Sequence, residues 1–257
     1  MIIAVCGKGG VGKTTVSAVA ARALSRRKGA RSLIVDADPA GGLSVALALD
    51  PGKTLNDVRK EIIEEVKAGL RDEKDLAVSL DYLLAEALTE RGNLAFLSIG
   101  RPEDVGCYCK VNVLLKDAIE GLAGRFDCAV IDAEAGIEQV NRKVMSAVDY
   151  VLLVADTSAK ALKVAETIKE VAERMIGGVG AGLLINRARD EGEAGAVVRN
   201  TSLQVLGWVP EDETVREFDA GGKSFLGLPD CPASNAIERA LEAAGLLERT
   251  YLPEPGV

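Results

Sequence analysis

One stretch near the amino terminus decides the fold: Gly7-Lys8-Gly9-Gly10-Val11-Gly12-Lys13-Thr14. It fits the pattern G-x-x-x-x-G-K-[ST] at every fixed position. An apolar run typical of a strand precedes it, and a run of good helix formers follows it. A glycine-rich bend between a strand and a helix can point its backbone N–H groups inward, and the helix dipole adds positive charge at the same place. The pattern therefore predicts a phosphate cradle; the alternative is a tight glycine-rich turn without a ligand.

Each position of this cradle has an expected role toward a nucleotide. Lys13 is expected to neutralise the β- and γ-phosphates, and the Thr14 hydroxyl is expected to bind Mg²⁺. Lys8 comes early in the bend and therefore lies on its rim rather than its floor. From the rim, Lys8 can reach a second copy of the site. The predicted nucleotide-binding residues of this segment are Gly7, Lys8, Gly9, Gly10, Val11, Gly12, Lys13, Thr14 and Thr15.

Short apolar runs alternate with helical patterns along the rest of the chain, which is typical of β-α-β units. We predict an α/β fold with a doubly wound, mostly parallel sheet flanked by helices, in one domain over residues 1–250. A helical insertion is expected at about 51–91 and a flexible tail at 251–257. The expected strands are Ile2–Cys6, Arg31–Val35, Leu94–Ser98, Cys128–Ile131, Tyr150–Ala155, Gly182–Ile185 and Leu203–Trp208. The expected helices are Lys13–Arg27, Val111–Leu122, Ile137–Ala147, Ala159–Arg174, Thr214–Ala220 and Ala233–Leu246.

Composition narrows the range of functions. The net charge of −8 argues against binding to nucleic-acid backbones, and no apolar run is long enough to cross a membrane. The start of the chain carries no secretory signal, so we expect a cytoplasmic protein with reduced thiols. Histidine is absent and five cysteines are present. A soft-metal site must therefore use cysteine, and a carboxylate is the natural group to orient an attacking water.

Acidic residues follow two of the predicted strands. Asp36 and Asp38 come after the second strand and point to the same side if the chain is extended. Asp36 is expected to support the Mg²⁺ shell; the alternative is that both acids cap a turn before Pro39. Asp132 ends a strand and is expected to hold Mg²⁺ through water. Gly136 follows four residues later and would let the backbone approach the γ-phosphate and move when it leaves.

A further strand ends in Asn186 and Arg187. The Asn186 amide offers both a donor and an acceptor, so it can pair with the edge of a purine base. Arg187 can stack on that base or can be a surface charge. Both residues are therefore predicted to bind nucleotide.

Two cysteines, Cys107 and Cys109, stand in a glycine-containing loop just before a predicted amphipathic helix. Thiols near a helix amino terminus favour the thiolate, which is the metal-binding form. One Cys-x-Cys pair supplies only two sulfurs, whereas a closed site needs four ligands. Two copies related by a two-fold axis would supply all four. The alternative is a pair of incidental thiols.

The segment K-G-G-x-G-K-T with its two lysines resembles the deviant Walker A class of P-loop ATPases, which includes the Min and Par partitioning ATPases and the nitrogenase iron protein. This resemblance implies a homodimer around ATP, with Lys8 contacting the partner's nucleotide. It also implies a catalytic group of Lys8, Lys13 and Asp38, in which Asp38 positions the water. Pro210 would belong to a loop that closes over the base.

Within that class, Gly106-Cys107-Tyr108-Cys109 and Ala135-Gly136-Ile137-Glu138 resemble the CooC-type nickel-insertion accessory ATPases of carbon monoxide dehydrogenase. The resemblance implies Ni²⁺ or Zn²⁺ held by Cys107 and Cys109 at the dimer interface, and a nickel metalloenzyme as client. A positioning ATPase of the ParA or MinD type is one alternative. The other is a reductase like the nitrogenase iron protein, in which Cys107 and Cys128 would hold an iron–sulfur cluster.

Overall fold

A computed structural model describes residues 1–69, 82–101, 121–133, 148–245 and 247. The predicted helix Ile137–Ala147 lies outside these ranges, and the predicted helix Val111–Leu122 lies almost entirely outside them. The predicted tail also falls outside the described residues.

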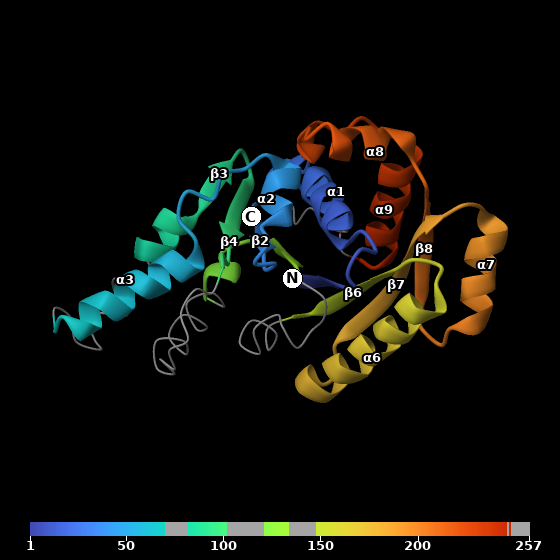
Figure 1. Ribbon diagram of the computed structural model, residues 1–257, viewed down its shortest axis with the longest axis horizontal. Helices are drawn as coiled ribbons and strands as arrows, with labels where there is room; N and C mark the ends of the chain where they lie inside the picture. Colours follow the sequence, from blue (N-terminus) through green and yellow to red (C-terminus); the bar gives the residue numbers. More distant parts are fainter. Residues whose placement is uncertain (70–81, 102–120, 134–147, 246, 248–257) are drawn as a thin grey trace, which may run out of the picture.

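The described strands form one eight-stranded sheet in the order β3-β4-β2-β5-β1-β6-β7-β8. All neighbouring pairs are parallel except β3 with β4 at one edge. The predicted doubly wound, mostly parallel sheet is therefore confirmed (Figure 1). The strands are β1 Ile2–Cys6, β2 Ser32–Asp36, β3 Thr89–Arg91, β4 Leu94–Ser98, β5 Cys128–Asp132, β6 Tyr150–Ala155, β7 Gly180–Ala188 and β8 Val205–Pro210.

Helices cover both faces of this sheet. Figure 1 shows α1, α8 and α9 gathered on one side and α6 on the other. The described helices are α1 Lys13–Ser25, α2 Gly42–Leu47, α3 Leu55–Lys67, α6 Ala159–Ile176, α7 Glu191–Asn200, α8 Glu213–Ala220 and α9 Pro232–Ala243, with a short 3-10 turn, η2, at Phe225–Gly227. Helices α2 and α7 were not predicted, because both are short and contain glycine or other small residues. It also placed the end of β7 too early, because β7 continues through Asn186 to Ala188.

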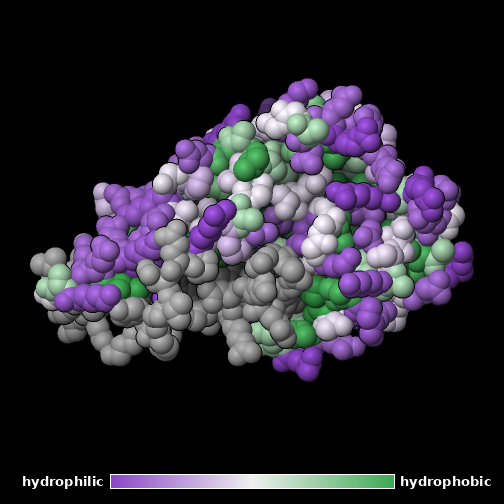
Figure 2. All heavy atoms as spheres, in the orientation of Figure 1, coloured by the Kyte–Doolittle hydropathy of each residue, from purple (hydrophilic) through white to green (hydrophobic). Residues whose placement is uncertain are grey.

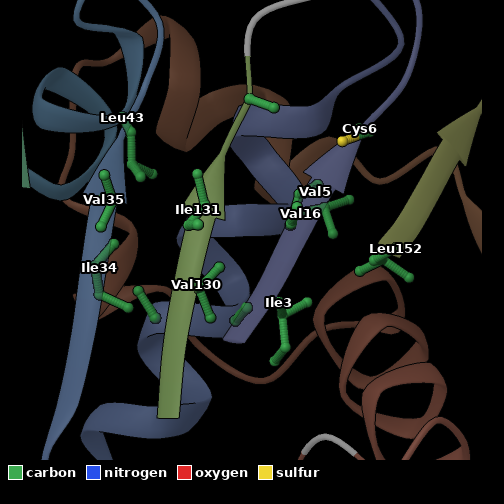
Figure 3. Packing of buried hydrophobic residues seen from close by; sticks show 14 of the residues in the cluster. Ile3, Val5, Cys6, Val16, Ile34, Val35, Leu43, Val130, Ile131 and Leu152 are labelled. Carbon is green, nitrogen blue, oxygen red and sulfur yellow. The ribbon is translucent and has the colours of Figure 1, made fainter. Parts of the chain in front are cut away.

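The core lies between the central strands and α1. Residues of β1 and β5 are almost completely buried, as expected for strands covered on both faces. In Figure 3, Val16 of α1 lies against Val5 of β1, and Leu43 of α2 extends the cluster over Val35 of β2. This packing fixes α1 against the sheet and therefore fixes the bend that joins β1 to α1.

The predicted insertion at about 51–91 contains α3, which projects from one end of the molecule (Figure 1). Strand β3 also falls in this range and was not predicted, since Thr89-Glu90-Arg91 has no apolar alternation. Figure 2 shows hydrophilic side chains spread over α3 and most of the described face. No described helix combines the length and apolar character that crossing a membrane requires.

An ion network around the buried Arg22 side chain ties α1 to α9 and to the loop that precedes α9. The Arg22 side chain is fully buried, and its Nε donates to the Leu228 carbonyl at 2.7 Å. Its guanidinium also pairs with Asp230 and with Glu238 of α9. The same Asp230 carboxylate accepts from Arg26 Nη1 at 2.8 Å. The burial of one guanidinium among these partners holds α1 and α9 side by side.

Candidate nucleotide-binding site

The predicted cradle forms the bend between β1 and α1, at the carboxyl edge of the sheet. Gly12 is the N-cap residue of α1 and has φ 93° and ψ 26°, a left-handed conformation that favours glycine. A Cβ at Gly12 would overlap the Asn186 amide nitrogen of β7. At the start of the bend, a Cβ at Gly7 would overlap the Val154 carbonyl oxygen of β6. The bend therefore needs glycine at both ends, where neighbouring strands approach it.

The two lysines occupy different positions in the cradle. Lys13 is buried, and its Nζ donates to the Lys8 carbonyl oxygen at 3.3 Å across the bend. Lys8 itself is half-buried, and the next residues, Gly9 and Gly10, are exposed. The N-cap residue of α1, Gly12, has no side chain with which to cap the helix. An anion at this helix end would meet the helix dipole and the Lys13 ammonium together.

Asp132 ends β5 directly beneath the cradle and is 1% exposed. Its Oδ2 accepts from Thr14 Oγ1 at 2.8 Å, and its Oδ1 accepts from Ser17 Oγ at 2.9 Å. Burial raises the pKa of this carboxyl to about 6, although the two hydroxyl donors act in the opposite direction. Thr14 and Asp132 thus bring a hydroxyl and a carboxylate together, which are the oxygen ligands that Mg²⁺ prefers.

The other two predicted acids are bound to the backbone of their own loop. Asp36 is fully buried; its carboxylate accepts from the backbone N–H groups of Asp38, Leu43 and Ser44 at 3.2, 3.1 and 3.0 Å. Burial is the main cause that raises the Asp36 pKa. Asp38 is half-buried, and its Oδ1 accepts from Ala40 N at 2.8 Å.

The contacts from Asp38 N and Ala40 N lie in the turn around Pro39, where the capping alternative put both acids, whereas Leu43 N and Ser44 N join Asp36 to the start of α2. Asp36 also pairs in register with Asp132 across β2 and β5, so the two acids end neighbouring strands. The Mg²⁺ role of Asp36 and the water-positioning role of Asp38 stay predictions.

Asn186 and Arg187 brace the cradle from β7. Asn186 is 5% exposed, and its Nδ2 donates to the Val11 carbonyl at 2.7 Å. Arg187 has φ 57°, in a stretch where the β7–β8 register shifts, and its Nη1 donates to the Gly10 carbonyl at 3.2 Å. A left-handed conformation at a residue other than glycine is uncommon and turns this guanidinium toward the cradle. The predicted contact of Asn186 with a base stays a prediction.

A pocket of about 590 Å³ opens beside the cradle. Four predicted nucleotide-binding residues line it: Thr15, Asn186, Arg187 and Pro210. Its size suits a small ligand, and its position next to the phosphate cradle suits the base and sugar of a nucleotide. The structure therefore brings together residues that lie almost 200 positions apart in the chain.

Ser17 and Asp212 are among the residues near this site that were not predicted as site residues. Ser17 contacts Asp132, and its spacing of three from Thr14 on a helix was the available signal. Asp212 lines the pocket and joins two helices: its carboxylate accepts from Thr214 N of α8 and from Ala233 N of α9, each at 2.9 Å. Only the folded structure places α9 beside Asp212.

Three predicted site residues, Gly136, Cys107 and Cys109, lie outside the residues that the structure describes. Within the described ranges, no group of three or more acidic or cysteine side chains is placed to hold a metal ion. The described cysteines, Cys6, Cys128 and Cys231, are all buried free thiols.

Comparison with known proteins places the chain among nucleotide-binding proteins. Residues 2–225 match the CobQ/CobB/MinD/ParA nucleotide binding domain. The chain is 35% identical over 249 residues to an uncharacterized ATP-binding protein of Methanocaldococcus jannaschii, covering 94% of this chain and 96% of the relative. It is 30% identical over 280 residues to the carbon monoxide dehydrogenase accessory protein CooC of Rhodospirillum rubrum, covering 100% of both chains.

A solved structure has the same fold. The cell division ATPase MinD of Pyrococcus furiosus superimposes with a TM-score of 0.69 at 26% identity, covering 96% of this chain and 99% of that protein. The prediction of a P-loop ATPase fold with a nucleotide cradle is confirmed. The chain belongs to the CobQ/CobB/MinD/ParA family of P-loop nucleotide-binding ATPases.

Proposed function

We propose that this chain is a cytoplasmic, Mg²⁺-dependent ATPase that dimerises around its nucleotide. In this proposal it binds Ni²⁺ or Zn²⁺ through Cys107 and Cys109 and delivers the ion to a metalloenzyme of the carbon monoxide dehydrogenase type. The main support is the combination of a braced cradle with end-to-end similarity to an accessory protein of that enzyme.

The chain's own residues account for nucleotide binding. Lys13 and the free helix end would bind the phosphates, while the pocket beside Asn186 and Pro210 would receive adenosine. Thr14 and Asp132 would hold Mg²⁺, which when bound supplies positive charge to the β- and γ-phosphates. Asp38 would orient the water whose oxygen bonds to the γ-phosphorus as the bond to the β-phosphate oxygen breaks.

Dimerisation would complete the site. Lys8 lies on the rim beside the exposed Gly9 and Gly10, so the cradle faces outward. A second copy facing this rim would place its own Lys8 against the first copy's phosphates. Two lysines from different chains would then balance the charge of one triphosphate. Loss of the γ-phosphate would weaken this contact and change how the two subunits are arranged.

The metal-binding proposal rests on Cys107 and Cys109 because the described cysteines are poor ligands. Burial raises the pKa of the Cys6 thiol to about 12 and that of the Cys128 thiol to about 11, so neither readily forms the thiolate. The Cys231 sulfur accepts from Ser234 N at 3.5 Å as the cap of α9. Two Cys-x-Cys pairs, one from each protomer, would supply four sulfurs to one ion.

A double variant, Cys107→Ala with Cys109→Ala, tests the metal role. Metal content after incubation with Ni²⁺ or Zn²⁺ should fall from about one ion per dimer to none, because a four-sulfur site needs both pairs. Nucleotide binding should survive. Cys231→Ser is the matched control, since it removes a thiol and keeps an oxygen to cap α9; its metal content should equal that of the unmodified protein. Stoichiometric metal in the double variant would refute the proposal.

Positioning in the manner of MinD or ParA is the second candidate, favoured by the likeness to a MinD structure. It would require a membrane-binding or DNA-binding surface, so sedimentation with liposomes or a DNA mobility shift would support it over metal delivery. The iron-protein alternative is less favoured. Cys128 begins β5, at the edge of the sheet opposite the cradle, and is 4% exposed.

A further inference from the structure

Ser17 is a fully buried hydroxyl that the standard roles of the cradle leave unexplained. It lies one helical turn after Thr14 in α1, and both side chains reach the end of β5. Each of the two hydroxyls donates to a different oxygen of Asp132, at 2.8 Å for Thr14 and 2.9 Å for Ser17. The carboxylate is therefore held at both oxygens by one helix.

The two hydroxyls are not equivalent. A hydroxyl has one proton and two lone pairs. Thr14 gives its proton to Asp132 Oδ2 and keeps lone pairs that can face a cation. Ser17 is 0% exposed and lies on the far side of the carboxylate, at Oδ1. Ser17 therefore has no access to the cation and can act only through Asp132.

From this arrangement we infer that Ser17 is a positioning residue for the Mg²⁺ site, holding the Asp132 carboxylate so that its free lone pairs and those of Thr14 face one cation. This inference rests on the proposed Mg²⁺–nucleotide function. Partners behind a ligand that fix its orientation commonly contribute about ten- to a hundredfold to metal affinity. Loss of the Ser17 hydroxyl frees Asp132 to rotate away from that orientation.

The test measures nucleotide affinity as a function of Mg²⁺ concentration, using a fluorescent ADP analogue with the full chain. In Ser17→Ala, the Mg²⁺ concentration giving half of the Mg²⁺-dependent gain in affinity should rise about tenfold. Affinity measured in EDTA should stay within about twofold, because the phosphate contacts of the cradle are untouched. Ser17→Thr keeps the hydroxyl, so its half-maximal Mg²⁺ concentration should equal that of the unmodified protein.

Ser25→Ala is the matched control. Ser25 lies in the same helix, and its hydroxyl donates to the Arg22 carbonyl at 2.7 Å, away from Asp132. Its removal should leave the Mg²⁺ requirement unchanged. If Ser17→Ala does not fold, Ser17→Cys carries the test, since a thiol of similar size donates only weakly and should give a smaller shift in the same direction.

The outcomes are distinguishable. An unchanged Mg²⁺ requirement in Ser17→Ala overturns this inference and leaves the ATPase proposal standing. An equal loss of affinity with and without Mg²⁺ would assign Ser17 a purely structural role and also overturn it. If the unmodified protein binds no adenine nucleotide at any Mg²⁺ concentration, the proposed function itself fails.

Discussion

Replacing Gly12 by alanine tests how closely β7 braces the cradle. The new methyl group faces two separate penalties. Alanine in a left-handed conformation costs about 1–2 kcal/mol. The methyl group would also overlap the Asn186 amide nitrogen, while the Asn186 Cγ lies 3.6 Å away. Asn186 must move, and its 2.7 Å hydrogen bond to the Val11 carbonyl must lengthen or break.

The size of the effect follows from these contacts. Crowding at a packed site costs about 1–3 kcal/mol, and a lost hydrogen bond costs about 0.5–1.5 kcal/mol. Together with the backbone cost, these losses should lower the free energy of unfolding of Gly12→Ala by about 2.5–6.5 kcal/mol. Gly10→Ala is the matched control, because Gly10 has φ 84° but no atom within 4 Å of its Cβ position. In Gly10→Ala the free energy of unfolding should fall only by the cost of the left-handed backbone conformation, about 1–2 kcal/mol.

Equilibrium urea unfolding without nucleotide measures both losses. A double-mutant cycle with Asn186→Ala isolates the crowding, because the truncated side chain leaves room for the methyl group. The double variant should therefore lose about 1–3 kcal/mol less stability than the sum of the losses of the two single variants. Equal destabilisation by Gly12→Ala and Gly10→Ala, or no coupling in the cycle, would refute the bracing by Asn186.

Three further predictions concern the three acids near the cradle, Asp132, Asp36 and Asp38. The Asp132 pKa, raised to about 6 by burial, means that the folded state binds this proton more tightly than the unfolded chain. The proton bound by Asp132 therefore stabilises the folded state fully below about pH 4, and this stabilisation is lost as the pH rises through 6. In metal-free urea unfolding, Asp132→Asn should gain about 2–3 kcal/mol relative to the unmodified protein between pH 4 and pH 8; a difference independent of pH would contradict this. Asp36→Asn should cost about 1–3 kcal/mol, since one oxygen cannot replace a carboxylate that accepts from three backbone N–H groups. Asp38→Asn should keep its bond from Ala40 and its stability but slow ATP hydrolysis about 100-fold; unchanged hydrolysis by Asp38→Asn would remove its role.

Elements and site residues could be predicted from the sequence where the local apolar pattern and the side-chain chemistry indicate the same structure. The cradle, the start of α1 and all seven predicted strands follow from apolar runs and glycine spacing, and they occupy the predicted positions within a few residues. Asn186, Arg187, Pro210 and Thr15 were predicted as nucleotide-binding residues and all line the pocket beside the cradle. Their convergence depends on parallel strands ending at one edge of the sheet, which the β-α-β rhythm implies.

Contacts that depend on exact three-dimensional neighbours could not be predicted. The sequence shows Asp36 as an acid at a strand end, but only the turn back into α2 brings Leu43 N and Ser44 N to its carboxylate. Burial of Arg22 was equally hidden, because its partners Asp230 and Glu238 lie more than 200 positions away in the chain. The edge strand β3 has no apolar alternation, and pairing with β4 alone makes it a strand.

The Arg22 network also has a consequence for how the protein is made. During synthesis β1 and α1 leave the ribosome before the segments that hold them, because β1 pairs with β5 and β6, and α1 is held by Asp230 and Glu238. The apolar strand β1 must therefore wait without its partner strands until β6, which ends at Ala155, has emerged. Such dependence on distant partners makes folding slow and exposes an aggregation-prone segment meanwhile. A nascent chain halted before residue 230 should consequently depend on chaperones and be unable to retain nucleotide.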